Sequence, residues 1–512
     1  MSKCRISIST ILLGSALAAP ALAGSAQQTL PGMHQSLPHY VIRDVGSLGG
    51  GFGIYSNPGS RALNSTGANV GVMSTGITDP FCPNWCFYDG YVDHAFEWKK
   101  GHATDLGALS DAFSSFALGI NDKGLTVGIS QTGNVDPVTG APVVHGVRWR
   151  QQVIEDLGAL GGSQSLAAAV NLSGRIAADS ETGVSDPYLN VAQANCLWLP
   201  TGTGAACNQF DFGTNTFLLP VTSQTHAALG SPHKSLRDLG TLGGPDSTAL
   251  DINDNGQAVG WSYASYNAGV SGVPDTRPVL WNHGAATDMG SLGGTFGAAM
   301  LVNSNGQAIG VSNLAGDATV HPFVWDSTHG MTDLGSFGGW YSHPNWINDN
   351  GDVVGISSTA DDTRRAFYWH DGVLENLGTV GTDDRSTAVG INNNGLIVGY
   401  TYGSDGSEIR AFISDQGGAL VDLNTLIRKP HGLNVLAAYY INDRNEIVGF
   451  ALTNTGEIHP VVLIPENDAD RLADSGDSNS APPARSSHAA THAKIGALCG
   501  RGPMFARLCA SR

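Results

Sequence analysis

Positive charge is scarce in this 512-residue sequence. Only 14% of the residues are charged, and 26 Lys and Arg stand against 44 Asp and Glu, which gives a formal net charge of -18. A nucleic acid or an anionic membrane needs a basic surface to neutralise its phosphates. Neither is therefore expected as the principal partner.

Long apolar runs and sustained helical periodicity are also missing from most of the chain. After residue 23 no stretch reaches the roughly 18 consecutive apolar residues of a membrane helix, so no membrane span is predicted. No G-x-S-x-G elbow, H-E-x-x-H pair or phosphate loop occurs in a supporting context. The sequence thus assigns no catalytic residue and no cofactor, and it leaves enzymatic activity uncertain.

The first 23 residues have the layout of a secretory signal peptide. Lys3 and Arg5 precede an apolar stretch from Ile11, and small residues end the segment at Ala23. We expect the mature protein to be secreted or periplasmic, with a linker at 24–39. At the other end, residues 466–512 combine an acidic, Ser-rich part with a basic one and are predicted to be a disordered tail.

Cysteines are few, and those outside the signal peptide form an even set. Six remain, an arrangement suited to disulfides in an oxidising compartment. We expect three local pairs, although six cysteines allow about 15 connectivities in principle. The expected pairs are Cys82 with Cys86, Cys196 with Cys207, and Cys499 with Cys509. The "CPNWC" segment encloses no His, Asp or Glu, so a metal site is not favoured there.

A repeat of about 50 residues, within the range of propeller blades and solenoid coils, fills the region 40–465. Its most regular element is an Asn followed three residues later by Gly, or by Asn in the last copy. The Asn residues are Asn64, Asn121, Asn171, Asn253, Asn303, Asn348, Asn392 and Asn442, and the paired positions are Gly67, Gly124, Gly174, Gly256, Gly306, Gly351, Gly395 and Asn445.

One copy, "DINDNG" at 251–256, fits the start of a calcium loop, D-x-[DN]-x-[DN]-G. An EF-type loop also needs a bidentate Glu at its twelfth position, where this copy has Ser262, and Asp251 has no acidic equivalent in the other copies. Gly and Asn share the ability to adopt a positive φ. The element is therefore predicted to be a hairpin turn, and no metal is assigned.

Each copy then continues through three further strand patterns. They are a short strand ending in Val-Gly or Ile-Gly, a strand such as "HAFEW" or "HPFVW", and a "TDLG" strand with a Gly-rich link. Four short strands joined by turns make one antiparallel blade. The predicted fold is an all-β propeller of four-stranded antiparallel blades.

The "HAF" triplet at 94–96, together with the "DLGxLGG" and "INxxGxxVG" elements, resembles the HAF-family extracellular repeat proteins over residues 40–465. The resemblance implies export and β-repeats and carries no defined activity.

The two ends of the repeat region have complementary deficits. "DVGSLGG" at 44–50 precedes any turn motif, whereas the last copy lacks its fourth strand. We predict eight blades, the last closed by the N-terminal strand, with Asp44 near His459; seven blades is the alternative.

Repeated basic and acidic residues are expected to pair across strands within blades rather than to form an active site. The third strand opens with a His or Arg, and an Asp or Asn follows 11 or 12 residues later. The basic residues are His94, His145, Arg277, His321, Arg365, Arg410 and His459; the others are Asp105, Asp156, Asp288, Asp333, Asn376 and Asp422, with Asp44 for His459.

One face of the propeller is expected to carry the long loops, and aromatic residues there suit sugar rings or extended peptides. The predicted ligand-binding residues are Trp85, Tyr88, Tyr188, Tyr263, Tyr266, Trp340 and Tyr341. The alternative is that these rings pack on each other as loop cores. The leading interpretation is a monomeric exported protein that binds a glycan, peptide or surface protein.

Two other functions stay open. One is a polysaccharide hydrolase or lyase using loop carboxylates, with Asp89, Asp93, Asp186, Asp361, Asp362, Asp383 and Asp384 as candidates. The other is a structural module for assembly at the cell surface.

Overall fold

A computed structural model describes residues 37–55, 61–81, 90–188, 222–232, 234–269, 272–403 and 409–468. These belong to one compact unit that begins at Leu37. Nearly all of its regular structure is β-strand. Among the described residues, no helix is both long and apolar enough to span a bilayer.

The first four blades are consecutive antiparallel meanders. Blade 1 comprises β2 (Gly53–Ile54), β3 (Asn69–Thr78), β4 (Tyr91–Lys99) and β5 (His102–Asp105). Blade 2 comprises β6 (Ser115–Ile120), β7 (Thr126–Val135), β8 (Pro142–Arg150) and β9 (Val153–Asp156). Blade 3 comprises β10 (Ser165–Val170), β11 (Ile176–Glu181), β12 (Thr225–Ser231) and β13 (Lys234–Asp238). Blade 4 comprises β14 (Ser247–Ile252), β15 (Ala258–Tyr263), β16 (Thr276–Asn282) and β17 (Ala285–Asp288).

The remaining blades repeat the same order. Blade 5 comprises β18 (Gly293–Val302), β19 (Ala308–Leu314), β20 (Val320–Asp326) and β21 (Gly330–Asp333). Blade 6 comprises β22 (Gly338–Ile347), β23 (Val353–Thr359), β24 (Arg364–His370) and β25 (Val373–Asn376), and a single parallel bridge links it to blade 5. Blade 7 comprises β26 (Arg385–Ile391), β27 (Leu396–Tyr402), β28 (Ile409–Asp415) and β29 (Val421–Asp422), followed by the 3₁₀ helix η1 (Leu423–Leu426). Blade 8 comprises β30 (Leu433–Ile441), β31 (Ile447–Thr453), β32 (Ile458–Pro465) and β1 (Tyr40–Asp44).

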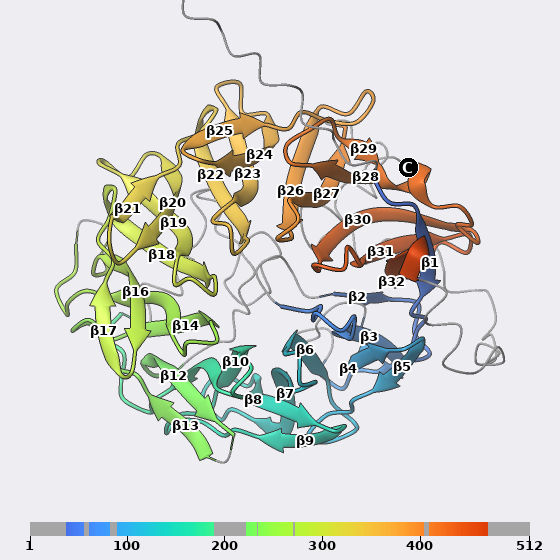
Figure 1. The fold of residues 1–512 in the computed structure, drawn as a ribbon. Helices are drawn as coiled ribbons and strands as arrows, with labels where there is room; N and C mark the ends of the chain where they lie inside the picture. Colours follow the sequence, from blue (N-terminus) through green and yellow to red (C-terminus); the bar gives the residue numbers. More distant parts are fainter. Residues whose placement is uncertain are drawn as a thin grey trace, which may run out of the picture. The chain divides into compact units, whose positions relative to one another are not determined.

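The described strands thus group into four-stranded antiparallel units that follow one another in chain order around a ring (Figure 1). This confirms the predicted propeller fold. The closure by the N-terminal strand is also confirmed, because β1 pairs antiparallel with β32. His459 Nδ1 lies 3.0 Å from the Asp44 carboxylate across that junction.

The Asn-Gly element is a hairpin turn, as predicted. In the "DINDNG" copy the Gly256 N–H donates to the Asn253 carbonyl at 2.9 Å, and the Asn253 Oδ1 accepts the Gln257 N–H at 3.0 Å. Gly256 has a φ of +80°, and Asn445, which replaces Gly in the last copy, has a φ of +62°. The left-handed conformation therefore explains why only these two residue types occupy the position.

Each turn asparagine also forms a hydrogen bond that the sequence did not predict. Its side-chain Nδ2 donates to the backbone carbonyl of the turn asparagine in the next blade, at distances between 2.8 and 3.1 Å. The last bond runs from Asn442 back to Asn64. All eight side chains are buried, and each Nδ2 is paired, so the ring is fixed without leaving these buried donors unpaired. We call this set the asparagine ring.

The Val-Gly ending of the second strand, which recurs among the copies, is explained by close packing inside a blade. A Cβ atom at Gly128 would lie 1.9 Å from the carbonyl oxygen of Phe116 on the neighbouring strand, where the register shifts. Only glycine fits such an approach without backbone movement. Blade 3 has Ala178 at this position, paired with Ala167.

The predicted cross-strand pairs form wherever the third strand opens with histidine. The Nδ1 to carboxylate distances are 3.0 Å for His94–Asp105, 2.9 Å for His145–Asp156 and 2.9 Å for His321–Asp333. Blade 3 adds a pair that the prediction missed, His226–Asp238 at 2.8 Å. The pairing is diagonal, because Asp105 lies opposite Phe96, two residues beyond the histidine.

The same prediction was wrong for the three arginine copies. Arg277 pairs with Asp275 at 3.5 Å, and Arg410 pairs with Asp383, in place of the expected Asp288 and Asp422. A longer side chain reaches carboxylates on the loops, which a histidine ring cannot. Arg365 forms no hydrogen bond with Asn376 in the described structure; its Nη1 instead lies 3.5 Å from the Arg364 carbonyl.

Side chains from different blades meet inside the ring. Arg61, just before the first turn, donates to the Asp251 carboxylate of blade 4 at 3.2 Å and to the Val302 carbonyl of blade 5 at 2.9 Å. On other blades, the rings of Trp346 and Tyr440 lie 5.8 Å apart. Asp251 is thus a buried partner of an arginine, which explains its position better than a calcium ligand would.

Candidate functional site

The long connections between the second and third strands carry most of the predicted ligand-binding residues. Of these residues, Trp85 and Tyr88 lie outside the described residues, as does the candidate acid Asp89. All six cysteines of the expected disulfides are also outside them, so the pairing stays a prediction. The predicted boundaries of the signal peptide and the tail are likewise untested.

Three of the predicted tyrosines come together where blades 3 and 4 meet; we call them the tyrosine cluster. Tyr188 donates its hydroxyl to the Tyr266 carbonyl, and its ring lies 6.4 Å from that of Tyr263 in an edge arrangement. Gln224 Nε2 lies 3.4 Å from the Tyr266 hydroxyl. The cluster therefore joins the loops that follow β11 and β15.

The three rings differ in exposure, and this divides their roles. Tyr266 is 54% exposed, whereas Tyr263 is 4% exposed and also contacts Trp261 at 5.5 Å. Tyr263 was predicted to touch a ligand, but its burial makes it a support for the loop. Tyr266 presents the ring face suited to stacking, and the half-buried Tyr188 holds its backbone.

Two carboxylates lie beside these tyrosines, and the charge of one, Asp186, acts on the other, Asp246. Burial, reinforced by the charge of Asp186, raises the pKa of Asp246 to about 7, against the opposing hydrogen bond from the Thr225 N–H. Burial also raises the pKa of Asp186, whose Oδ1 accepts the Tyr188 N–H at 2.8 Å. The pKa of Tyr263 is raised by burial and then by these two carboxylates. The site thus holds an acid that is partly protonated at neutral pH.

A third acid, Asp179 on β11, belongs to the same interface. Ala177, two residues earlier on the strand, packs against Ala249 and Trp281 of blade 4, and alternate residues of a strand share a face. Burial raises the pKa of Asp179 to about 7. Its Oδ1 has no hydrogen-bond partner among the described residues.

Trp340 and Tyr341 form a separate cluster on blade 6. Their ring centroids lie 5.4 Å apart, and Trp340 Nε1 donates to Asp362 Oδ1 at 3.1 Å. The Arg364 guanidinium lies 5.8 Å from the centroid of the Tyr341 ring. Within the described part of the chain, no ring contact links this pair to the tyrosine cluster. The structure therefore divides the single predicted surface into at least two places.

The remaining candidate acids are either bonded to nearby groups or partly or fully buried. Asp383 accepts the Thr401 hydroxyl at 2.5 Å and pairs with Arg410. Asp361 accepts the Thr359 and Thr363 hydroxyls within one turn, and these bonds lower its pKa. Asp93 is fully buried and Asp384 half-buried. Of the acids proposed from the sequence, Asp186 best combines a raised pKa with a neighbouring aromatic surface.

Asp246 was missed because its local sequence, "GGPDSTA", reads as an ordinary strand start. The signal was its alignment with Ser114 and Gln164, which precede the first strands of blades 2 and 3. Each accepts a backbone N–H from the previous blade: Asp93 N–H to Ser114 at 3.0 Å, Val144 N–H to Gln164 at 2.8 Å, and Thr225 N–H to Asp246 at 2.7 Å. A charged residue at a position of neutral acceptors marks the interface.

No protein-family model matches the chain, and no curated protein matches it. Solved structures with a similar fold include TolB from Acinetobacter baumannii, at 12% identity and a TM-score of 0.32, with 69% of this chain and 78% of that chain covered. YCF48 bound to D1 peptide shows 11% identity and a TM-score of 0.32, with coverages of 66% and 90%. The oligogalacturonate lyase of Vibrio parahaemolyticus shows 7% identity and a TM-score of 0.35, with coverages of 84% and 98%. These likenesses concern the fold alone.

Proposed function

We propose that this chain is an exported propeller that binds a glycan through the tyrosine cluster between blades 3 and 4. The observation that carries the proposal is the exposed ring of Tyr266, held by Tyr188 and Gln224 beside two carboxylates. A peptide or a surface protein is the alternative ligand at the same site.

The chemistry of the cluster suits a neutral sugar. An aromatic face packs against the C–H groups of a pyranose, and carboxylates accept hydrogen bonds from its hydroxyls. Asp246 at a pKa of about 7 has a proton to donate as well as oxygens to accept. A rigid blade beneath the loops limits the entropy lost on binding.

Glycan array screening followed by calorimetry tests the proposal. Tyr266→Ala should weaken binding of the glycan found by roughly tenfold or more, because it removes the exposed ring. Tyr188→Phe should give a smaller loss, since it removes only the hydroxyl that fixes the Tyr266 carbonyl. Trp340→Ala on blade 6 is the matched aromatic control.

Equal losses for Tyr266→Ala and Trp340→Ala would show a ligand that spans both clusters. A loss for Trp340→Ala alone would move the site to blade 6 and overturn the assignment. Each variant needs an unchanged melting temperature, because early unfolding would instead identify the rings as loop cores.

An enzymatic function at the same site is favoured by one observation, the raised pKa of Asp246 beside ionisable Asp186. Two carboxyl groups with separated proton affinities are the usual acid and base of glycan cleavage. Product release from the bound glycan, lost in Asp246→Asn while affinity is retained, would establish turnover. Absence of any product over hours would leave the binding function.

A further inference from the structure

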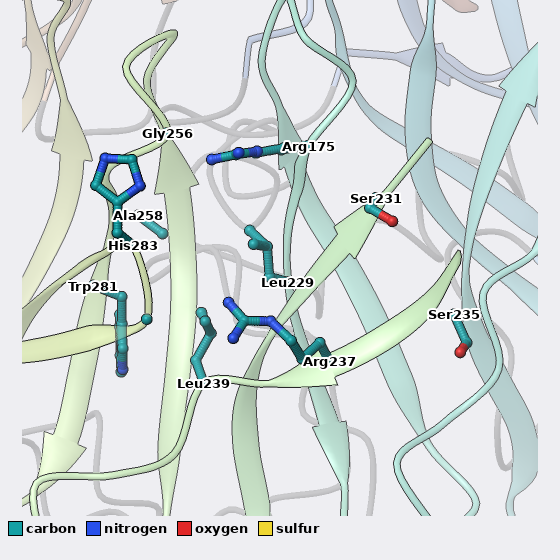
Figure 2. A pocket seen from close by; sticks show the side chains of 11 residues that line it. Arg175, Leu229, Ser231, Ser235, Arg237, Leu239, Gly256, Ala258, Trp281 and His283 are labelled. Carbon is teal, nitrogen blue, oxygen red and sulfur yellow. The ribbon is translucent and has the colours of Figure 1, made fainter. Parts of the chain in front are cut away.

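A cavity lies at the end of the interface between blades 3 and 4 that is opposite the tyrosine cluster, beside the tight turns. It has a volume of about 390 Å³ and is lined from blade 3 by Leu229 and Arg237 and from blade 4 by Trp281 and His283. Arg175, the first residue after the blade 3 turn, completes one wall. Figure 2 shows the guanidinium groups of Arg175 and Arg237 with Leu229 between them in that view, and that of Arg175 points toward Gly256 and Ala258.

The charge of this cavity is opposite to that of the protein. Arg175, Arg237 and His283 line it, and none of its lining residues is acidic, although the chain carries a net charge of -18. Among the described residues, the two guanidinium groups and the imidazole form no ion pair and no side-chain hydrogen bond. By contrast, Arg444, which lies within the last turn, pairs with Glu446 at 2.6 Å. Two guanidinium groups near each other without an anion repel.

Four other blades carry a hydrogen-bond acceptor at the position of Arg175, and the remaining three carry Ala68, Leu125 or Leu396. The acceptors are Gln257, Gln307, Asp352 and Glu446, and each accepts the Nδ2 of its own ring asparagine, at 2.8, 2.9, 2.9 and 2.7 Å. Arg175 cannot accept that bond and extends instead across Gly256 of blade 4. A Cβ atom there would lie 2.6 Å from its Nη1. Blade 3 thus has a cation that lines the cavity where four other blades have an acceptor.

One residue that lines the cavity also has a hydrogen-bond donor without a described partner. Trp149 on blade 2 donates its Nε1 proton to the Leu106 carbonyl of blade 1 at 2.9 Å. Trp281 is its equivalent on blade 4 and is 2% exposed, but its Nε1 has no partner in the described structure. The Leu239 carbonyl, equivalent to that of Leu106, is not bonded to it. A buried donor of this kind is rare unless a ligand or water satisfies it.

From these observations we infer that the cavity binds a small organic anion, a carboxylate or phosphate group joined to an apolar body. The acidic group lies against Arg175, Arg237 and His283, where charge-assisted hydrogen bonds are strongest. The apolar body lies on Leu229, Leu239 and Trp281. Because water takes about 30 Å³ per molecule, the cavity has room for roughly a dozen waters, which is more than a bare phosphate fills.

Calorimetry with the full mature chain tests this inference with four probes: phenyl phosphate, benzoate, inorganic phosphate and phenol. Phenyl phosphate and benzoate supply both parts of the ligand and should bind saturably, whereas inorganic phosphate should bind more weakly and phenol not measurably. Arg237→Ala and Arg175→Ala should each weaken phenyl phosphate binding by roughly tenfold. The matched control is Arg444→Ala, which removes the paired arginine at another turn and should leave affinity unchanged.

Arg237→Lys keeps the charge and gives a result even if one alanine variant folds poorly; it should retain more affinity than Arg237→Ala. The intrinsic fluorescence of Trp281 provides a second readout, because phenyl phosphate should change it in the parent and not in Trp281→Phe. The inference is overturned if no organic anion binds saturably at millimolar concentration, or if Arg444→Ala weakens binding as much as Arg237→Ala. Glycan binding at the tyrosine cluster should not change in these variants, so the two sites fail independently.

Discussion

The interface between blades 1 and 2 and the interface between blades 3 and 4 are built on the same positions, yet they differ in how their polar groups are paired. In the first, Trp149 donates to the Leu106 carbonyl and a serine hydroxyl caps the loop end. In the second, the equivalent tryptophan has no described partner, an aspartate stands in place of that serine, and two free arginines flank the turn end. Several equivalent positions of the repeat thus change together from paired, uncharged groups to charged or unpaired ones, and this change indicates a ligand.

The asparagine ring runs through both interfaces, and breaking it should have the largest effect. Asn64→Ala and Asn171→Ala each remove a bond to the next blade and three bonds within the turn. Each should lower the free energy of unfolding by about 3 to 5 kcal/mol, since buried partners are left unpaired. Asn255→Ala, an exposed turn residue that also bonds to the next blade, should cost less than about 1 kcal/mol. Guanidinium denaturation measures all three.

Asp246→Asn tests the difference between the two interfaces at their loop ends, through the pH dependence of stability. With a folded pKa of about 7 against an ordinary value of 3.8, the folded chain holds a proton that the unfolded chain releases. Stability of the parent should therefore fall as pH rises from about 4 to about 7, and stay level above. The variant keeps an acceptor for the Thr225 N–H without the charge. It should be more stable than the parent by about 2 to 4 kcal/mol at pH 8, and equal to it near pH 4.

Asp156→Asn on blade 2 is the control of opposite sign. Burial alone would raise the pKa of Asp156, but the hydrogen bonds from His145 and the Gly158 N–H lower it below its ordinary value. Its contribution is present above about pH 4 and lost as pH falls through the folded pKa. This variant should be less stable than the parent at neutral pH and should match it only in acid. The same pH trend in both variants would contradict the assigned difference.

The two tryptophans give the most direct contrast. Trp149→Phe leaves the buried Leu106 carbonyl without its donor and should destabilise by about 1 to 2 kcal/mol. Trp281→Phe removes a donor with no described partner and should cost less than about 0.5 kcal/mol beyond the small change in ring area. Thermal unfolding followed by circular dichroism measures both. A larger loss for Trp281→Phe would mean that its N–H is satisfied within the folded chain.

The turn glycines give the smallest expected contrast. Gly124→Ala and Gly256→Ala both place alanine at a positive φ, which costs about 1 kcal/mol at each site. A Cβ at Gly124 has open space, whereas one at Gly256 meets Arg175. The additional loss at Gly256 should be about 0.5 kcal/mol, because a flexible guanidinium can move, and Arg175→Ala should remove it. A double-mutant cycle measures this coupling.

Much of the fold was predictable because its signals are local and repeated. The positive φ at Gly256 and Asn445 and the pairing of His459 with Asp44 follow from residue type and spacing within one repeat. The asparagine ring was not predicted, since a turn asparagine looks complete once it bonds its own backbone. The pairing of Arg410 with Asp383 was not predicted, because the length of a side chain does not show which loop it reaches.

The sites were harder to predict, because they depend on which loops meet. The sequence placed Tyr188, Tyr263 and Tyr266 on one face, but burial separates Tyr263 from Tyr266, and this follows from blade contacts that the sequence does not encode locally. Arg175 and Arg237 lie 62 positions apart in ordinary strand contexts, and nothing marked them as a pair. The resemblance to the HAF-family proteins, the export and the disulfides stay predictions.

The asparagine ring has no first and no last member. A solenoid can gain or lose a repeat at an end, whose cap then pairs with solvent. Here each asparagine forms all its hydrogen bonds only when both neighbouring blades are folded. Asn442 bonds to Asn64, which lies far from it in the sequence. Removing one blade would leave an asparagine Nδ2 on one side of the gap and an asparagine carbonyl on the other without a partner, although both are buried in the complete ring. The blades are therefore expected to form and to melt together, so that a duplication or deletion of one repeat has to be accommodated by all of them at once.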